Sequence, residues 1–355
     1  MTKLSARTKL CLLLFALALV WRVLGAPVTV KDFQSLRVSF WQARTLLPDR
    51  AVRMLLLWFA PSEEGVDNHQ KQAEMITVFM NEENRMVHLP LEEYVRGVVA
   101  AEMPAQYHLE ALKAQAVAAR TRVLWQIGQG GCKTHPGSDI CTDSAHCQGY
   151  ALAEECREQW GEEYSYYSDR LLKAQSETEG EWIAYDDQPI AVLYHAISGG
   201  RTEDSQTVFA QQLPYLISVE SENEENVRGY QQETKWTFED IARKLQGETN
   251  GLVLTEDNIR RTFSIIDYTA SGRVKTVQIG DVRIDAADLR RMLGLRSTWF
   301  SISADDSGIT FYQRGYGHGV GMSQAGANVM AASGADYRQI LQHYYTGVSI
   351  KEEYE

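Results

Sequence analysis

Residues 91–104, LEEYVRGVVAAEMP, carry the clearest structural pattern in this chain. Apolar side chains recur at the spacing of one buried helix face, at Leu91, Tyr94, Val95, Val98 and Val99. We therefore expect a helix over residues 91–103 that ends at Pro104. Glu102 continues the same series, so a carboxylate occupies a position where the pattern requires an apolar residue.

Glu102 also lies in the last turn of the expected helix, and two effects should raise its pKa. Burial disfavours the charged carboxylate, and so does the negative end of the helix dipole. A carboxyl group with a pKa closer to neutrality suits a general acid. Another interpretation stays open, in which Glu102 pairs with an arginine or caps a neighbouring element. Three nearby acidic residues fit solvent-facing positions and are expected to be surface charges: Glu92, Glu93 and Glu110.

The segments around this helix predict a mixed α+β fold. Upstream, residues 75–80 and 85–89 are strand-like runs joined as a hairpin by residues 81–84. Downstream, an alanine-rich helix over residues 110–127 precedes an irregular loop over residues 128–150. The later elements follow without βαβ alternation: a strand at 190–195, a turn at 198–200, a hairpin at 263–268 and 274–279, a helix at 287–293, a strand at 309–313, and helices from about Ser323 and Asp336.

Residues 1–30 are expected to form an N-terminal membrane anchor helix. Three basic residues precede an apolar run that continues to Val30 and is interrupted by Arg22. A membrane-spanning helix needs roughly 20 residues, and the run reaches this length because the Arg22 side chain can extend to the membrane surface. The preceding positive charges place the N-terminus inside and the rest of the chain outside. A cleaved signal peptide is the alternative, although Pro27 would directly follow the candidate cleavage site.

Composition limits what the rest of the chain can do. Residues 31–73 are expected to be a tether or accessory segment, and residues 74–355 the folded extracytoplasmic region. A hydrophobic content of 44% indicates a globular protein. The net charge of −12 argues against a nucleic-acid partner, because phosphates need a basic surface. The 17 tyrosines and 8 tryptophans suit a polysaccharide ligand instead.

The loop after the second helix contains a possible metal site. Its residues His135, Cys141, His146 and Cys147 offer two imidazoles and two thiolates, a set that suits tetrahedral zinc. Disulfides are the alternative outside the cytoplasm. Cys132 and Cys156 are left over and are expected to be buried free thiols, whereas Cys11 falls in the anchor.

Glycines alternate from Gly315 to Gly321, just before the helix expected from about Ser323. The spacing does not match the G-x-G-x-x-G dinucleotide loop, and residues 321–325 only approach the nucleophile elbow of serine hydrolases, without its final glycine. We interpret the turn as a place where a sugar ring lies against the backbone. The residues expected to contact sugar here are Gly317, His318, Gly319, Ser323 and Gln324.

A second motif, YHAISGGRT at residues 194–202, is expected to face the same substrate groove. Its candidate sugar-binding residues are Tyr194, His195, Ser198 and Gly199. A tight turn packed in the core is the alternative interpretation of these residues.

Several stretches occur in an order shared with one known family: LEEYV (91–95), AAEMP (100–104), EALKAQA (110–116), ART (119–121), YHAISGGRT (194–202), LGLRSTWF (293–300) and GYGHGVGMSQAGA (315–327). Together they resemble the stage II sporulation protein D family, membrane-anchored lytic transglycosylases of spore-forming bacteria. The resemblance covers roughly residues 75–350. It implies a two-lobed catalytic region with a substrate groove and a catalytic role for Glu102.

The resemblance also implies a mechanism that needs only one carboxylic acid. A glycoside hydrolase usually needs two, whereas in a lytic transglycosylase Glu102 would act as acid and then as base. It would cleave the bond between N-acetylmuramic acid and N-acetylglucosamine and leave a 1,6-anhydro end. Amidase enhancers share this domain and stimulate a wall hydrolase without cutting, which makes them the main alternative. A buried acid favours the enzyme, because an enhancer does not need one.

Further expectations come from the family alone. Some clostridial members bind zinc through two Cys and two His, which His135, Cys141, His146 and Cys147 match in order and type, so one structural zinc ion is implied. Zinc-dependent hydrolysis, a third possibility, would need an open position on the metal. The implied partners are peptidoglycan stripped of stem peptides, a wall amidase and a multi-span membrane protein. The implied location is the mother-cell membrane during engulfment of the forespore.

Overall fold

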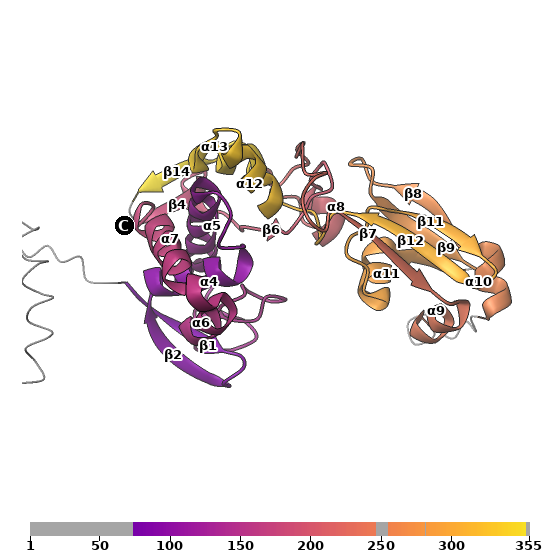
Figure 1. The fold of residues 1–355 in the computed structure, drawn as a ribbon, viewed down its shortest axis with the longest axis horizontal. Coiled ribbons are helices and arrows are strands. Elements are labelled where there is room, and N and C mark those ends of the chain that lie inside the picture. Colours follow the sequence, from indigo (N-terminus) through magenta and orange to yellow (C-terminus); the bar gives the residue numbers. More distant parts are fainter. Residues whose placement is uncertain (1–73, 246–254, 281, 353–355) are drawn as a thin grey trace, which may run out of the picture. The chain divides into compact units, whose positions relative to one another are not determined.

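The computed structural model describes residues 74–245, 255–280 and 282–352. The predicted anchor and tether, residues 1–73, lie outside these ranges. Within them, no helix combines the length and the apolar character that a membrane crossing requires. The described chain mixes helices with several small sheets, which confirms the α+β class (Figure 1). The arrangement as two lobes with a groove stays a prediction.

The first elements form as the sequence predicted. Strands β1 (Met75–Met80) and β2 (Arg85–Pro90) pair antiparallel, with Met80 opposite Arg85 at the turn. Helix α4 (Leu91–Glu102) follows directly and buries the expected apolar face. Helix α5 (Leu109–Gly128) begins after Pro104, and its many alanines allow other elements to pack closely around it.

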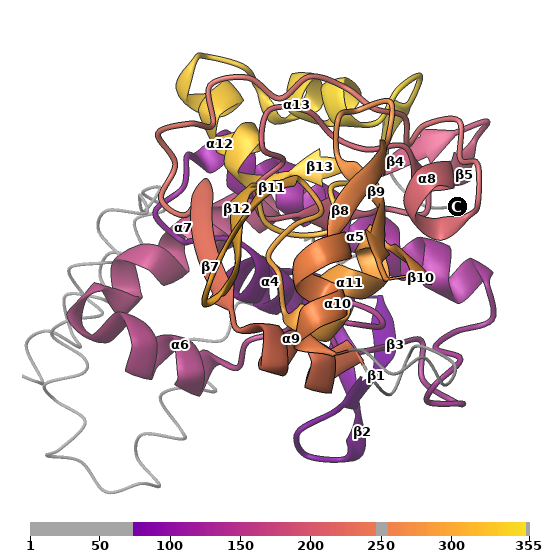
Figure 2. The same ribbon diagram turned by 90° about the vertical axis from the view of Figure 1, so that its right-hand side faces the viewer.

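Helix α5 is the centre of a large hydrophobic core. It contacts α4, α7, β4, α12 and α13, and Figure 2 shows α12 and α13 lying over it. The remaining elements of this part are β3 (Ile140–Cys141), α6 (Ala153–Trp160), η2 (Gly161–Glu163), α7 (Tyr164–Ser176), β4 (Glu181–Tyr185), β5 (Gln188–Pro189), β6 (Tyr194–His195), α8 (Ser205–Phe209), β13 (Met322–Ser323), α12 (Gln324–Ala332), α13 (Tyr337–Tyr344) and β14 (Ser349–Glu352). Strand β3 joins β1, and β14 and β5 flank β4.

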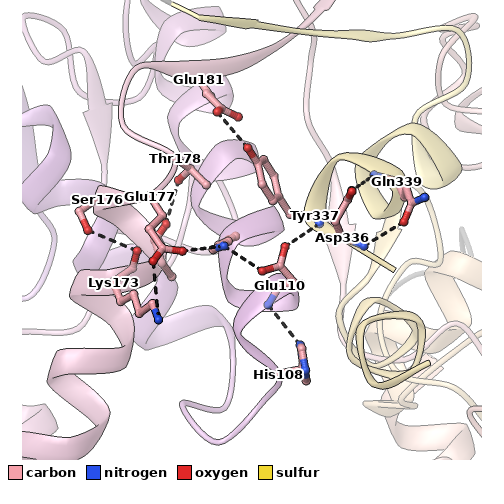
Figure 3. Close-up of polar contacts among 12 residues, drawn as sticks. His108, Glu110, Lys173, Ser176, Glu177, Thr178, Glu181, Asp336, Tyr337 and Gln339 are labelled. Carbon is pink, nitrogen blue, oxygen red and sulfur yellow. Dashed lines mark hydrogen bonds and ion pairs between the residues drawn. The ribbon is translucent and has the colours of Figure 1, made fainter. Parts of the chain in front are cut away.

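A network of polar contacts attaches α13 to the central helix (Figure 3). Glu110 of α5 accepts a hydrogen bond from the Tyr337 backbone N–H at 3.1 Å and forms an ion pair with Lys113 at 2.8 Å. Lys113 also pairs with Glu177 at 2.7 Å, while the Tyr337 hydroxyl donates to Glu181 at 2.9 Å. The prediction that Glu110 is a plain surface charge was therefore wrong, because its carboxylate links two helices.

Glu92 departs from the same prediction for a similar reason. Its carboxylate accepts two hydrogen bonds from Arg120, at 2.6 and 2.7 Å, and one from Gln175 at 2.9 Å. The Arg120 side chain is only 1% exposed, so the charge of Glu92 neutralises a buried cation. Glu93 alone of the three is exposed as expected.

Residues 231–314 surround a second, separate hydrophobic core. Two antiparallel sheets, ordered β11-β12-β7 and β10-β9-β8, share it with three helices (Figure 1). The predicted hairpin and helix are confirmed as β8, β9 and α11. The elements are β7 (Gln231–Trp236), α9 (Phe238–Leu245), α10 (Glu256–Thr262), β8 (Ser264–Tyr268), β9 (Val274–Ile279), β10 (Val282–Asp285), α11 (Ala286–Leu293), β11 (Phe300–Asp305) and β12 (Gly308–Arg314).

One short parallel pair brings the two distant sequence motifs together. Strand β6 pairs with β13, so Tyr194 lies opposite Met322 and His195 opposite Ser323. The strand predicted over residues 190–195 is thus regular only at its last two residues. Because β6 and β13 are adjacent, the motifs at 194–202 and 315–327 form one site.

Candidate active site

Glu102 lies at a cavity of about 280 Å³. It is the last residue of α4, and the other walls come from α5, the loop after it, β6, α8, α11 and the glycine turn before β13. Four of the predicted sugar-binding residues line the cavity with it: Tyr194, His195, Gly317 and His318. The structure therefore joins the expected acid with part of the expected binding surface.

The Glu102 carboxylate is partly buried, and burial raises its pKa. Its Oε1 atom accepts a hydrogen bond from the Gly149 backbone N–H at 2.7 Å, which opposes this rise, as do the side chains of Gln324 and Tyr194. Gly149 can come this close because it lacks a side chain; a Cβ atom there would lie 3.1 Å from Oε1. The net shift is upward, so the protonated form persists closer to neutral pH.

The backbone of Val320 holds two histidines that line the same cavity as Glu102. His195 donates from Nδ1 to the Val320 carbonyl at 3.1 Å, and His318 accepts at Nδ1 from the Val320 N–H at 3.0 Å. Burial lowers the pKa of His195 well below its usual range and that of His318 to about 4, so both rings are neutral. His195 Nε2 is buried without a hydrogen-bond partner in the described chain. It can therefore accept a hydrogen bond from a ligand.

Three predicted sugar contacts instead surround a buried carboxylate, Glu224. Ser198 and Gly199 donate to its Oε2 atom at 2.8 and 3.0 Å, while Ser323 and Ser221 donate to Oε1 at 2.6 and 2.7 Å. Ser323 also caps α12 through the Gly326 N–H. The structure thus gives Ser198, Gly199 and Ser323 a structural role, because their polar groups already have partners away from the cavity.

The two glycines predicted to face sugar differ from each other. Gly317 lines the cavity with φ +115°, and a Cβ atom there would lie 2.7 Å from the Cβ atom of His195. Gly319 is buried with φ +86°, and its missing side chain makes room for the Arg273 guanidinium, 2.6 Å from the ideal Cβ position. Gly319 is therefore required by packing within the protein, and no sugar ring needs to be invoked.

Gln324 is also buried, and its amide donates to Gln115 at 3.4 Å.

The cysteine and histidine loop forms one compact cluster. Ligand atoms of Cys132, Cys141, His146 and Cys147 lie within 4.8 Å of one another. His146 Nδ1 is 3.6 Å from the sulfurs of Cys132 and Cys141 and 3.2 Å from that of Cys147. All four cysteines of the described chain, the three of this cluster and Cys156 of α6, are free thiols. A donor set of three thiols and one imidazole fits tetrahedral zinc.

The membership of this cluster corrects the prediction at one position. His135 stacks on the Phe79 ring, with centroids 3.7 Å apart, and is not part of the cluster. Cys132, which was expected to be a leftover thiol, takes its place. The reason is that the loop folds back, with Cys132 N–H bonded to the Ser138 carbonyl, which brings residue 132 next to Cys147. Cys156 stays apart as a buried thiol, as expected.

Several residues of the site had no signal in the sequence. Arg122 and Arg290 line the Glu102 cavity, as do Gln148 and Phe209. They stand outside the motif stretches and come from four separate segments, so only the folded chain shows that they are neighbours. Glu224 also had no signal in the sequence, because it lies in an acidic stretch, residues 222–225, whose charged side chains would all be expected to face solvent.

Comparison with known proteins points to one family. A family model described as "Stage II sporulation protein" matches residues 80–185. The chain is 34% identical over 292 residues to stage II sporulation protein D of Bacillus subtilis, covering 82% of this chain and 83% of that protein. It is 33% identical over 278 residues to the protein of the same name from Bacillus amyloliquefaciens, covering 78% of each. An amidase enhancer of Bacillus subtilis is 30% identical over 303 residues, which cover 72% of this chain and 40% of the enhancer.

Proposed function

This chain belongs to the stage II sporulation protein D family, and we propose that it is a lytic transglycosylase of peptidoglycan. The reaction cleaves the β-1,4 bond between N-acetylmuramic acid and N-acetylglucosamine and makes the enzyme a carbon–oxygen lyase. The supporting observation is that Glu102 supplies the only carboxylate among the residues lining its cavity in the described chain. A hydrolase would need a second one.

Glu102 would perform both proton transfers. In its protonated form it donates to the bridging oxygen while the bond to C1 of the muramic acid breaks. The resulting carboxylate removes the proton from the C6 hydroxyl, whose oxygen bonds to C1 and closes the anhydro ring. The raised pKa of Glu102 favours the first step, because the acid form must be present at the start. Neutral His195, with a free Nε2 acceptor, would hold a sugar hydroxyl or acetamido N–H.

Mass spectrometry of the products tests this function. Peptidoglycan pretreated with an amidase should yield fragments with 1,6-anhydro-muramic acid ends. Fragments with only reducing, hydrated ends would show a hydrolase and overturn the proposal.

The similarity to an amidase enhancer supports a second candidate function. An enhancer would bind the wall or an amidase and stimulate cleavage without forming anhydro ends. Purified protein incubated alone with denuded glycan distinguishes the two functions. Anhydro products without added amidase support the enzyme, whereas products only in the presence of an amidase, and without anhydro ends, support the enhancer.

We also propose that Cys132, Cys141, His146 and Cys147 hold one structural zinc ion. Four protein ligands close a tetrahedral shell, so the metal would shape the loop and not activate water. The loop carries Gly149, the hydrogen-bond donor to Glu102, and zinc would thereby help to position the acid. Metal analysis should find one zinc per chain, reduced in Cys132→Ser and retained in His135→Ala. Zinc content that is reduced in His135→Ala and retained in Cys132→Ser would instead identify His135 as the fourth ligand.

The remaining expectations are proposals that follow from the family. The protein would be anchored by residues 1–30 in the mother-cell membrane, with the described region outside. It would act during engulfment with a wall amidase and a multi-span membrane protein. Co-purification from sporulating cells, with and without residues 1–30, tests both the anchor and the partners.

A further inference from the structure

A second hollow, of about 570 Å³, lies on the sheet β11-β12-β7. This is the sheet formed by the strands labelled β7, β11 and β12 in Figure 1. All residues that line the hollow fall within residues 231–314, and none of them lines the Glu102 cavity. Neither the proposed reaction nor the metal cluster uses this part of the molecule.

The register of the strands builds the hollow on one face of the sheet. Along β12, Tyr312 and Arg314 are exposed, whereas Gln313 between them is buried. This alternation is that of a strand with one face on a core and one face in water. Tyr312 lies directly opposite Ser301 of β11 and Glu233 of β7. Opposite residues of paired strands share a face, so the three side chains stand together on the solvent side.

Aromatic rings form much of the wall of this hollow. Tyr268, at the end of β8, is 55% exposed, and Tyr312 is 48% exposed. Trp299 lines the same hollow, and Gly272 keeps the edge of its ring uncovered, because a Cβ atom at Gly272 would lie 3.5 Å from Cζ2. Tyr and Trp rings have a large apolar face and a polar edge, so they suit a ligand that is itself part apolar and part polar.

Polar groups beside these rings can fix the orientation of such a ligand. The Arg314 guanidinium lies over the Trp299 ring, 3.7 Å from its centroid, and this contact holds the group in place. A guanidinium offers several N–H donors in one plane. The exposed amides of Gln231, opposite Arg314 on β7, and of Gln232 add both donors and acceptors. A few placed polar groups among aromatic rings are typical of a binding site for a small ligand or a cofactor.

The composition of the hollow favours an uncharged saccharide. Its charged lining residues in the described chain are one acid, Glu233, and one base, Arg314, so it has no excess positive charge for nucleic acid or anionic lipid. The other lining residues are aromatic, polar or glycine, without the aliphatic side chains that make the centre of a protein interface apolar. A sugar ring presents apolar C–H faces to the aromatic rings and hydroxyl or acetamido groups to the polar side chains.

The chain connects this hollow directly to the Glu102 cavity. Arg314 ends β12, and Gly317, three residues later, lines the cavity. Three residues span at most about 11 Å, a distance that a strand of a few sugars covers. The saccharide best placed to occupy the hollow is therefore the glycan that the neighbouring cavity is proposed to cleave.

We propose that Tyr268, Trp299, Tyr312 and Arg314 form a second glycan-binding site, which takes N-acetylhexosamine units of a wall strand outside the Glu102 cavity. The inference rests on the proposed function for the identity of the glycan. The rings stack on sugar faces, while Arg314 and the glutamines bind hydroxyl and acetamido groups. The site holds the strand and so raises its effective concentration at the cavity. It takes no part in the proton transfers.

Binding of a neutral probe tests the site directly. The probe is a soluble β-1,4-linked hexamer of N-acetylglucosamine, and calorimetric titration uses the Glu102→Gln background so that no ligand is consumed. Tyr312→Val keeps a residue that favours a strand but removes the ring, and it should weaken binding by about twofold to tenfold. Adding Tyr268→Val should weaken binding further. Tyr312→Phe keeps the ring and should bind nearly like the parent.

Tyr166→Ala is the matched control, because Tyr166 of α7 is 60% exposed and lines neither the hollow nor the Glu102 cavity. It should bind the hexamer like the parent, and thermal melting checks that every variant is folded. With Glu102 intact, Tyr312→Val should raise KM on long denuded glycan and leave kcat unchanged. That split is expected because the ring holds the strand and does not touch the reacting bond.

The outcomes separate this site from the proposed function. A parent that does not bind the hexamer, or equal binding by the parent and the folded double variant of Tyr268 and Tyr312, overturns the site even if anhydro products form. Hexamer binding that depends on both tyrosines, in a protein that yields no anhydro products, supports the site and overturns the transglycosylase. Analytical ultracentrifugation tests a second copy of the chain as the occupant: a parent dimer that Tyr312→Val dissociates, with hexamer binding unchanged, overturns the glycan assignment.

Discussion

Two glutamates of this protein, one partly and one fully buried, differ in how many hydrogen bonds they accept. Glu224 is 0% exposed and accepts four, from three hydroxyls and one backbone N–H. Its oxygens are therefore occupied within the protein. Glu102 accepts a hydrogen bond from the Gly149 backbone N–H at 2.7 Å, and its carboxylate lines a cavity. Only Glu102 is free to exchange a proton with a ligand.

Glu102→Gln tests this assignment through activity and stability together. The amide cannot donate the proton, so cleavage should fall by a factor of about 10²–10⁴. Because the folded state raises the pKa of Glu102, the stability contribution of this group is present at low pH and is lost as pH rises through the folded pKa. Near neutral pH the variant should therefore melt at or slightly above the parent temperature. A clear drop in melting temperature would indicate a structural role.

The pH profile of the parent follows from the same shift. The acid form of Glu102 must be present at the start of the reaction. The value of kcat/KM should therefore decline as pH rises through the raised pKa of Glu102. A kcat/KM series across this range measures the decline. A profile that rises over the same range would point to a group acting first as a base.

Gly319 tests whether packing or sugar contact requires a glycine there. Gly319→Ala would place Cβ against the Arg273 guanidinium, which adds about 1–3 kcal/mol of overpacking to the cost of its positive φ. Gly334→Ala has φ +99° and nothing within 4 Å, so it should show only the backbone cost, about 1–2 kcal/mol. Denaturant unfolding compares them. Equal losses of stability, with weaker glycan binding only in Gly319→Ala, would favour a sugar contact.

At the scale of secondary-structure elements, Glu224 connects the two motif segments. Its carboxylate bonds Ser198 and Gly199 after β6 and Ser323 at the start of α12, and Ser221 in turn contacts the Tyr344 hydroxyl of α13 at 2.6 Å. The parallel pairing of β6 with β13 lies within this network. The position of His195 beside Glu102 therefore depends on a residue outside both motifs.

Glu224→Gln should destabilise the protein by about 3 kcal/mol, because an amide N–H₂ would face donors that need an acceptor. Chemical denaturation gives the loss directly. Glu225→Gln is the control, since that neighbour is exposed, and it should stay within about 0.5 kcal/mol of the parent. A small effect at both positions would mean that the network can rearrange around water.

At the scale of the whole molecule, the described chain has two large hydrophobic cores. One surrounds α5, and the other lies within residues 231–314. Separate cores allow unfolding in more than one step. The acid comes from the first core and Arg290 from α11 at the second, so the cavity requires both.

Calorimetry of two matched variants tests this organisation. Leu112 in the first core and Leu289 in the second are both 0% exposed, and replacing either with Ala should cost about 2–5 kcal/mol. We expect two thermal transitions, one lowered by Leu112→Ala and the other by Leu289→Ala. A single transition lowered equally by both would show that the cores unfold as one unit.

The local sequence pattern by itself determined several secondary-structure elements of this protein and the candidate catalytic acid, Glu102. The hairpin, α4, α5 and α11 follow from short-range periodicity, and a carboxylate on an apolar helix face marks Glu102 because both signals lie within a few residues. Tertiary structure alone decided which residues share the cavity, which serines surround Glu224, and that Cys132 replaces His135 in the cluster. The physical reason is that these contacts join segments far apart in the chain, and their geometry depends on packing and hydrogen bonding that no local pattern encodes.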